Sequence, residues 1–336
     1  MLEVELDIFS GRENPKWILS GQEERELVDR LQAEPQQLSD VAASEQYSLG
    51  YRGLLVRNVK TDDGPWNRAM ASGVPTLPDE FRLGVRQSRA EPVAEWLLST
   101  SEPPQKHSGV TDELREVVAA GIAQVEAVQQ AATPARTGEI AATEVTREPG
   151  PEARFPVISG EAAHTPGAVA ADAAIQGAVW WACPSNYFIA NADIFNRPEN
   201  VGRNNCYCFA SNHLAGVRYA LPGKRGGQPA TSITCGGVTQ GLYADGWRDG
   251  CQQNGLTIVL VIWPNVDYHF YRLVTGGPYW WWGHKPGGTP AKYTDDCGHA
   301  IYQYQGQGYA PNNICRGPYT DFCGYFYQDN YTAFVA

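Results

Sequence analysis

Residues 204–213 read NNCYCFASNH, and this stretch decides how the second half of the chain is interpreted. Asn204 and Asn205 are good helix N-caps, because an asparagine side-chain oxygen accepts a hydrogen bond from a backbone N–H of the first turn. They predict a short helix over 205–215 with Cys206 in its first turn. The unpaired N–H groups of a first turn stabilise a thiolate and lower the pKa of a cysteine there. Cys206 is therefore predicted to be a reactive thiol, and the plainer interpretation is a buried or disulfide-bonded cysteine.

A lone histidine lies downstream in the apolar stretch VLVIWPNVDYHFY, residues 259–271. Residues alternate between the two faces of a strand, so His269 shares its face with Asp267 and Tyr271 and leaves the other face apolar. An imidazole there can act as general base to a thiol and form a thiolate–imidazolium pair with it. The alternative is a partly buried strand histidine with a hydrogen-bond partner. With a helix-start cysteine upstream, the sequence predicts Cys206 as nucleophile and His269 as base.

A nucleophile–base pair needs a third group that orients the imidazole through its other ring nitrogen. Asp321 is the first choice, because it enters a late expected strand that could pair near the histidine strand. Asp295 and Asp296 are the alternatives, and each can also be a solvated loop acid. Asn204 and Asn205 are expected to support the site, since first-turn backbone amides and an asparagine side chain can form an oxyanion hole.

Two further residues are candidate substrate contacts. His284 follows an expected strand over 279–283 and could reach a substrate, or it could close the turn and hydrogen-bond backbone carbonyls. Residues 280–282 are three consecutive tryptophans, and successive residues of a strand face opposite sides, so at least one is expected to face solvent or a cleft. An exposed tryptophan stacks on a sugar or a peptide aromatic, which makes Trp282 a candidate, although the plainer interpretation is a core position.

The redox state of the cysteines remains open at this point. All eight lie in the last 154 residues: Cys183, Cys206, Cys208, Cys235, Cys251, Cys297, Cys315 and Cys323. An even count in one domain favours disulfides in an oxidising compartment, whereas the lack of a visible signal peptide favours free thiols. A catalytic Cys206 would leave seven cysteines, and at least one more would then be unpaired. No metal or other cofactor is expected, because Cys206 and Cys208 do not have the usual zinc-ligand spacing.

Charge and hydropathy argue against a nucleic-acid partner and against a membrane span. The formal net charge is −11, and the first 170 residues carry the whole acidic excess, with 27 acidic and 16 basic residues. Nucleic-acid binding needs clustered Lys and Arg, so such a partner is not expected. No apolar run approaches the roughly 20 residues of a membrane span, and residues 1–6 lack the basic and apolar segments of a signal peptide. The expected location is the cytoplasm, or outside the cell by a non-classical export route.

Periodicity and composition predict an α+β protein in three parts. Residues 1–105 form a small α+β accessory domain, with alternating apolar residues at 2–8 and a capping box at 20–23. Residues 106–170 hold a helix and then an Ala/Pro-rich linker without periodicity. Residues 171–336 place short helices before an antiparallel meander, an order typical of α+β folds. The expected strands of this last part are 256–263, 266–274, 279–283 and 319–327.

Four segments carry a resemblance to a known family: NCY at 205–207, DYHFYR at 267–272, WGHKPGGTP at 282–290 and GPYTDFCGYF at 317–326. They are similar in order and spacing to the TecA-type effector deamidases, bacterial proteins with a papain-like core and a Cys-His-Asp triad. The resemblance covers residues 183–326. It implies that Cys206 is the nucleophile, His269 the base and Asp321 the orienting acid. This chain departs from the family in its extra cysteines and in a longer stretch over 292–316.

The residues and the resemblance together predict a thiol hydrolase or deamidase. Cys206 attacks an amide carbonyl of a protein or peptide substrate, and His269 takes and returns the proton while a thioester forms and breaks. The outcome is proteolysis, deamidation of Gln or Asn, or transamidation. The alternative is a disulfide-stabilised, aromatic-rich module that binds carbohydrate or protein without catalysis. A free Cys206 argues against the simple disulfide scaffold, and a disulfide at Cys206 argues against the enzyme.

Overall fold

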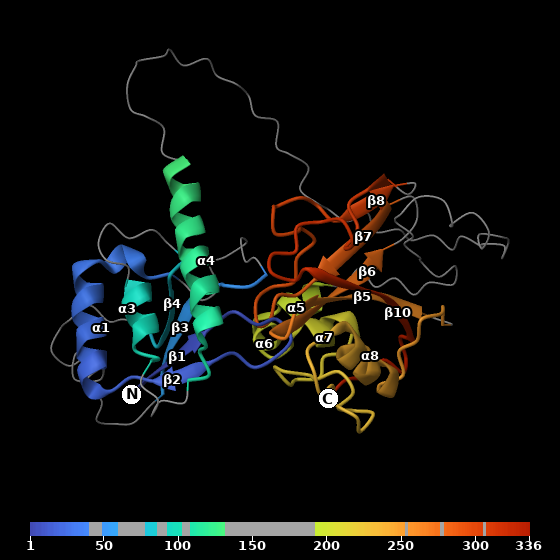
Figure 1. The fold of residues 1–336 in the computed structure, drawn as a ribbon, viewed down its shortest axis with the longest axis horizontal. Coiled ribbons are helices and arrows are strands. Elements are labelled where there is room, and N and C mark those ends of the chain that lie inside the picture. The colour runs from blue at the N-terminus through green and yellow to red at the C-terminus, as the bar shows by residue number, and fades with distance from the viewer. Residues whose placement is uncertain are drawn as a thin grey trace, which may run out of the picture.

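The computed structural model describes residues 1–39, 49–59, 78–85, 93–102, 108–131, 192–252, 255–275, 279–304 and 307–336. These parts contain two antiparallel sheets and several short helices, which confirms the predicted α+β class. We call the described residues up to 131 the N-terminal lobe and those from 192 the C-terminal lobe (Figure 1). The predicted linker and Cys183 lie outside the described residues. No helix in the described parts of the chain is both long and apolar enough to cross a bilayer.

The N-terminal lobe is built on a four-stranded antiparallel sheet in the order β2-β1-β3-β4. Its strands are β1 (Leu2–Leu6), β2 (Lys16–Ile18), β3 (Leu54–Asn58) and β4 (Glu80–Leu83). Its helical elements are α1 (Gly21–Ala33), the 3-10 turn η1 (Pro35–Gln37), α3 (Val93–Ser99) and α4 (Asp112–Ala131). The predicted capping box opens α1, because Ser20 Oγ accepts from Glu23 N and the Glu23 carboxylate accepts from Ser20 N.

The C-terminal lobe is built on a six-stranded antiparallel sheet in the order β10-β5-β6-β7-β8-β9. Its strands are β5 (Gly255–Trp263), β6 (Asp267–Thr275), β7 (Tyr279–His284), β8 (Tyr302–Tyr304), β9 (Gln307–Gly308) and β10 (Asp321–Asp329). Its helices are α5 (Asp193–Asn196), α6 (Pro198–Val201), α7 (Cys206–Ala210) and α8 (Cys235–Ala244). The predicted meander is confirmed as β5-β6-β7. The helix predicted over 205–215 is shorter, because the chain leaves α7 at Ser211 and Asn212 adopts a φ of 51°.

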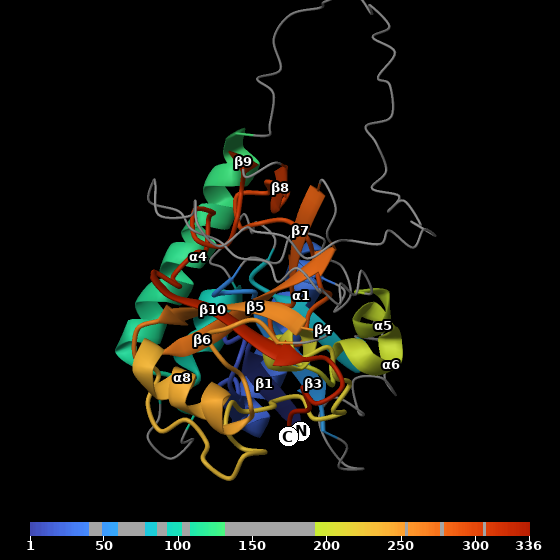
Figure 2. The same ribbon diagram turned by 90° about the vertical axis from the view of Figure 1, so that its right-hand side faces the viewer.

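The sheet of the C-terminal lobe is covered on both faces, and Figure 2 views it from the side of this lobe. Every residue of β5 is buried, as expected of a strand between two layers. The face that carries Ile258 and Leu260 packs with residues of α7 and α8. The face that carries Val259 and Val261 forms one continuous apolar core with the N-terminal lobe. The two lobes are therefore joined by buried packing as well as by the chain.

Disulfides pair other cysteines of the C-terminal lobe and leave the predicted nucleophile free. The described pairs are Cys235–Cys323 and Cys297–Cys315. The first joins the start of α8 to β10, and the second closes the segment that carries β8 and β9. Of the cysteines that the structure describes, Cys206 and Cys208 are free, and both are buried.

Candidate active site

The helix α7 begins at the predicted nucleophile. Asn205 is its N-cap, with extended φ and ψ of −95° and −170°, and its side-chain oxygen accepts a hydrogen bond from Cys208 N at 3.2 Å. Cys206 therefore occupies the first turn, as predicted. The Asn204 side chain instead holds the preceding turn, because its amide donates to the carbonyl oxygen of Asn200 at 2.9 Å. An oxyanion role for the two asparagines stays a prediction.

The thiol of Cys206 is fully buried against β6. Its Sγ lies 3.9 Å from the carbonyl oxygen of Tyr268, and the backbone N–H of Phe270 favours its thiolate. Burial, and then the negative charge of Asp267, raises the pKa of Cys206 well above its ordinary value, and the Phe270 donor opposes this only in part. The expectation of a lowered pKa is therefore wrong for this conformation. The physical reason is that α7 has only five residues and the thiol is shielded from water.

A second histidine orients His269. Nε2 of His269 lies 2.8 Å from Nδ1 of His284, and Nε2 of His284 lies 2.9 Å from the carbonyl oxygen of Thr294. A carbonyl only accepts hydrogen bonds, so the network assigns the His284 proton to Nε2, and His284 Nδ1 accepts from the Nε2–H of His269. Nδ1 of His269 then keeps its lone pair, and it has no hydrogen-bond partner among the described residues. This is the tautomer that a general base requires.

Both imidazoles are neutral near pH 7. Burial lowers the pKa of His269 well below its usual value near 6.5, and it is lowered further because protonated His269 would be repelled by a protonated His284 and by Arg52 and Lys292. Burial and then Lys292 lower the pKa of His284 in the same way, although the carbonyl of Thr294 opposes them. A neutral imidazole can accept the proton of a thiol, so the charge state of His269 suits a base.

The thiol and the imidazole lie at the same level of β6 but on opposite faces of the strand. Tyr268 and Phe270 point to the face that α7 covers, whereas His269 points to the opposite face and packs against Tyr271. The Cys206 thiol lies beside the backbone between these residues. No hydrogen bond links the Cys206 sulfur to the His269 ring, although the structure describes both side chains.

The predicted third residue, Asp321, is not the group that orients His269. It is the exposed first residue of β10, where it lies opposite Ile262 of β5. Because β5 separates β10 from β6 in the sheet, the carboxylate sits on a strand that does not pair with the histidine strand. The orienting position belongs to His284. Of the two roles predicted for His284, substrate contact or bonding to a carbonyl, the buried side chain has the second.

The alternative acids hold loops instead. Asp295 accepts hydrogen bonds from three backbone N–H groups of its own region, those of Cys297, His299 and Cys315. Asp296 accepts from the backbone N–H of Leu49 at 2.9 Å and lies 3.6 Å from Lys292 Nζ. Both carboxylates are therefore occupied as structural acceptors away from the imidazole.

Trp282 is a core residue and not a substrate contact. Its side chain is fully buried and packs against Tyr325, with ring centroids 6.0 Å apart. Its neighbour Trp281 points to the other face, where it is part-exposed and stacks on Tyr302 with an interplanar angle of 29°. The prediction that consecutive tryptophans divide between the two faces is confirmed, but the partly exposed ones are Trp280 and Trp281.

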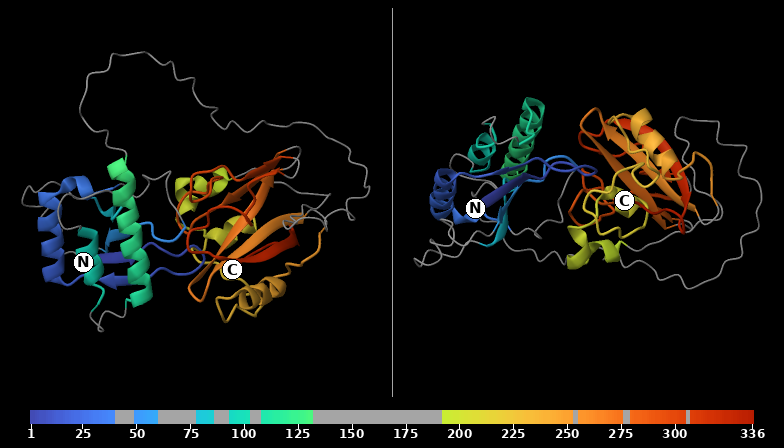
Figure 3. Two further views of the ribbon diagram at one scale, coloured as in Figure 1. Left: turned by 45° about the horizontal axis from the view of Figure 1, so that its top comes forward. Right: turned by 90° about the horizontal axis from the view of Figure 1, so that it is seen from below.

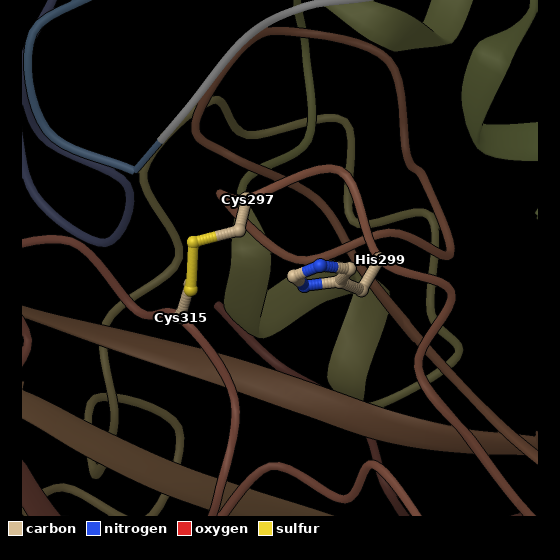
Figure 4. Close-up of side chains that lie close together, drawn as sticks. All are labelled: Cys297, His299 and Cys315. Carbon is tan, nitrogen blue, oxygen red and sulfur yellow. A yellow bond between two sulfur atoms is a disulfide. The ribbon is translucent and has the colours of Figure 1, made fainter.

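Cys297, His299 and Cys315 form a cluster with metal-ligand chemistry (Figure 4). Their ligand atoms lie within 4.8 Å of one another. The two sulfur atoms are bonded to each other, however, so neither is a thiolate that could bind zinc. The imidazole of His299 stacks on Tyr309 at 5.4 Å between ring centroids, and its Nδ1 lies 3.4 Å from Asp295 Oδ2. In its oxidised state the cluster is a disulfide-closed loop.

Asp267 is a buried acid whose role sequence reasoning missed. Its Oδ2 accepts from the backbone N–H of Ser10 at 2.6 Å, from that of Gly11 at 3.2 Å and from the Tyr319 hydroxyl at 2.6 Å. The two backbone donors lie 257 and 256 positions earlier in the chain. No local pattern could have revealed this contact, because it exists only where the two lobes meet.

Replacing Asp267 with asparagine is expected to change how stability depends on pH. Burial raises the pKa of Asp267 to about 6, although the Tyr319 hydroxyl and backbone N–H groups oppose this. The pKa of Asp267 in the folded protein exceeds its unfolded value near 3.8. The stability that the protonated acid contributes is therefore complete below pH 3.8 and is lost as the pH rises through about 6. The free energy of unfolding of wild type should therefore rise by about 3 kcal/mol relative to that of Asp267→Asn when the pH falls from about 7.5 to about 3.5.

Urea unfolding of both proteins at the two pH values measures this difference. The matched control is Asp249→Asn, since Asp249 is an exposed acid of the same lobe. An Asp267→Asn difference that is the same at both pH values would contradict the expectation.

Comparison with known proteins finds a relative that matches part of the chain. The chain is similar to insoluble matrix shell protein 1 of Ruditapes philippinarum, with 38% identity over 138 residues. The match covers 38% of this chain and 86% of that protein. No protein-family model and no solved structure matches the chain, so the resemblance to the TecA-type deamidases stays a prediction. On the identity and coverage of that match, the chain belongs to the family of insoluble matrix shell protein 1.

Proposed function

We propose that this protein is a cysteine-dependent acyl-transfer enzyme in which Cys206 is the nucleophile, His269 the general base and His284 the residue that positions the base. The observation that carries the proposal is the position of the thiol, which lies against the carbonyl before His269 and near the N–H after it. The free Nδ1 of His269 adds to it, because His284 occupies the other nitrogen. A helix that opens with cysteine and packs on an antiparallel sheet with a histidine strand is in keeping with a papain-like fold.

The proposed reaction is nucleophilic attack on an amide. Cys206 Sγ bonds to the carbonyl carbon of a protein or peptide substrate, and its proton passes to Nδ1 of His269. His269 returns the proton to the departing nitrogen as the C–N bond breaks, which leaves a thioester. Water then releases an acid, or an amine releases a new amide. Proteolysis, deamidation and transamidation differ only in which nitrogen leaves and which nucleophile arrives.

This chemistry requires β6 to rearrange first, because Cys206 and the His269 ring lie on opposite faces of that strand. Cys206 and His269 are both fully buried, and burial favours the neutral form of each group. Transfer of the proton from the thiol to the imidazole creates two opposite charges that stabilise each other once the side chains meet. Mutual stabilisation of that kind predicts a thiol whose reactivity depends on His269.

Alkylation with iodoacetamide tests the proposal, with Cys208 as the internal control. Cys208 is also free and buried and lies two residues along the same helix. At about pH 6, transient opening that brings the thiol to the imidazole should make Cys206 react about tenfold faster than Cys208 in wild type, because of the two cysteines only Cys206 lies against the histidine strand. His269→Ala and the conservative His269→Gln should both remove that preference. Peptide mass spectrometry gives the rate at each cysteine.

Two results would overturn the enzyme. One is equal alkylation of the two cysteines in wild type, and the other is a Cys206 preference that survives both His269 variants. Activity gives the matching readout on a peptide library, where Cys206→Ala should lose amide turnover and Cys208→Ala should keep it. Amide turnover that persists in both cysteine variants also excludes Cys206 as the nucleophile.

A second candidate function is a disulfide-stabilised module of an insoluble matrix. Two observations favour it: the relative is named as an insoluble matrix shell protein, and disulfides cross-link the C-terminal lobe. Disulfides also favour an oxidising compartment, so we infer that the protein is exported. In this case Cys206 is a packing residue, and the alkylation experiment should find it as inert as Cys208.

A further inference from the structure

The connection between β1 and β2, residues 7–15, reaches from the N-terminal lobe to the C-terminal lobe (Figure 3). At its tip, the backbone N–H groups of Ser10 and Gly11 donate to the carboxylate of Asp267 at 2.6 and 3.2 Å. The carbonyl oxygen of Gly11 accepts from Asn205 Nδ2 at 2.9 Å and from the Tyr268 hydroxyl at 2.7 Å. These partners directly precede the two proposed catalytic residues in the sequence.

The docked tip is closely fitted. Ser10, Asn205, Asp267 and Tyr268 are all nearly or fully buried. A Cβ atom added to Gly11 would lie 2.3 Å from Cε2 of the Tyr268 ring, which leaves no room for a side chain. Polar groups buried this completely need their partners, so removing the tip would leave the Asp267 carboxylate without two of its donors.

The N-terminal lobe fixes the shape of the connection. Arg52 of this lobe is fully buried, and its Nη2 donates to the Phe9 carbonyl at 2.6 Å and to Asp7 Oδ1 at 2.7 Å. On the far side of the tip, Arg12 Nη1 donates to the carbonyl of Val266 at 2.7 Å. The tip is therefore held from both lobes and is not a loose loop.

We propose that residues 10–12, here called the plug, are an autoinhibitory segment that keeps Cys206 and His269 covered until the plug is displaced. This inference rests on the proposed function, since covering the site regulates an activity only if the site has one. The plug offers a peptide carbonyl to Asn205 and Tyr268, so a substrate that uses the same two donors must compete with Gly11. Undocking of the plug then becomes the step that admits substrate.

The test is Gly11→Ala in the full-length protein, read as the iodoacetamide rate at Cys206. The added methyl group overlaps the buried Tyr268 ring and should expel the plug, which raises the rate about tenfold or more. The matched control is Gly21→Ala, because a Cβ there meets only Arg25 Nη1 at 3.9 Å. Arg12→Ala, which removes the anchor to Val266, should give a smaller increase.

Cys208 separates plug release from unfolding. If Gly11→Ala raises the iodoacetamide rates of Cys206 and Cys208 together, the variant has opened the whole lobe, and the plug proposal is wrong. The plug proposal is also wrong if Gly11→Ala leaves the Cys206 rate unchanged. Other results distinguish a failure of the proposed enzyme activity from a failure of the plug. If Gly11→Ala accelerates Cys206 but His269→Gln makes no difference in that background, the plug stands and the enzyme fails. If the Cys206 preference depends on His269 but Gly11→Ala has no effect, the enzyme stands and the plug fails.

Discussion

Replacing Asp7 with asparagine is expected to lower the free energy of unfolding by about 3–5 kcal/mol. Asp7 is buried between two arginines: its Oδ1 lies 2.7 Å from Arg52 Nη2, and its Oδ2 lies 2.7 Å from Arg82 Nη1. Asparagine keeps the shape but removes the negative charge that both buried guanidinium groups contact, and loss of charge compensation in a core is among the costliest changes a protein can suffer. Because Arg52 also holds the Phe9 carbonyl, the connection between β1 and β2 should loosen as well.

The sign of the pH dependence identifies the cause. Burial raises the pKa of Asp7, but Arg52 and Arg82 lower it by more, so the folded pKa lies below the ordinary value of 3.8. The stability that Asp7 contributes is therefore complete above the unfolded pKa and is lost as pH falls through the folded pKa.

Urea unfolding at neutral pH and at about pH 3 measures both effects, with Asp112→Asn as the control. Asp112 is fully exposed in the same lobe, and its substitution should leave the unfolding midpoint unchanged. A small Asp7→Asn effect, or one that grows in acid, would show that the two arginines do not depend on this carboxylate.

Removing the Cys235–Cys323 disulfide is the second change with a large expected effect. The bond joins α8 to β10 across 88 residues of sequence. Cross-linking residues this far apart restricts the unfolded chain, and the loop-entropy relation gives a loss of about 4–5 kcal/mol for the double variant Cys235→Ser/Cys323→Ser. The change should appear as a lower midpoint of urea unfolding under non-reducing conditions.

The second disulfide provides a graded control. Cys297 and Cys315 are 18 residues apart, so Cys297→Ser/Cys315→Ser should cost about 3 kcal/mol by the same relation. An equal loss for the two pairs would contradict a loop-entropy origin. A loss in the long-loop variant that is smaller than in the short-loop variant would point to strain or local packing as the dominant contribution.

Local patterns predicted the local structure of this protein well. The capping box at Ser20 and the N-cap at Asn205 were readable from sequence, because a cap is made by residues within one helical turn. Alternation placed His269 and Tyr271 on one face of β6, because successive side chains of a strand point to opposite sides. The α+β order and the β5-β6-β7 meander followed from the same periodicity.

Those local patterns did not predict which distant strands and cysteines pair with one another. The choice of Asp321 as orienting residue assumed that the last strand lies beside the histidine strand. Instead β10 pairs with β5, and the neighbour of β6 on the other side is β7, which ends at His284. Strand order is decided by which faces bury the most apolar surface, and a single sequence does not state that result. The disulfide partners were equally open, because eight cysteines allow many pairings.

The sequence by itself determined that Cys206 opens a capped helix and that His269 lies on a half-polar strand, because both facts depend on neighbouring residues alone. Only the tertiary structure decided how the two groups behave. It buried the thiol and raised its pKa, bonded His269 to His284, and brought Gly11 to Asn205 and Tyr268. The physical reason is that burial, electrostatic environment and docking arise from groups that lie between 15 and 257 residues apart in the chain and meet only in the folded protein.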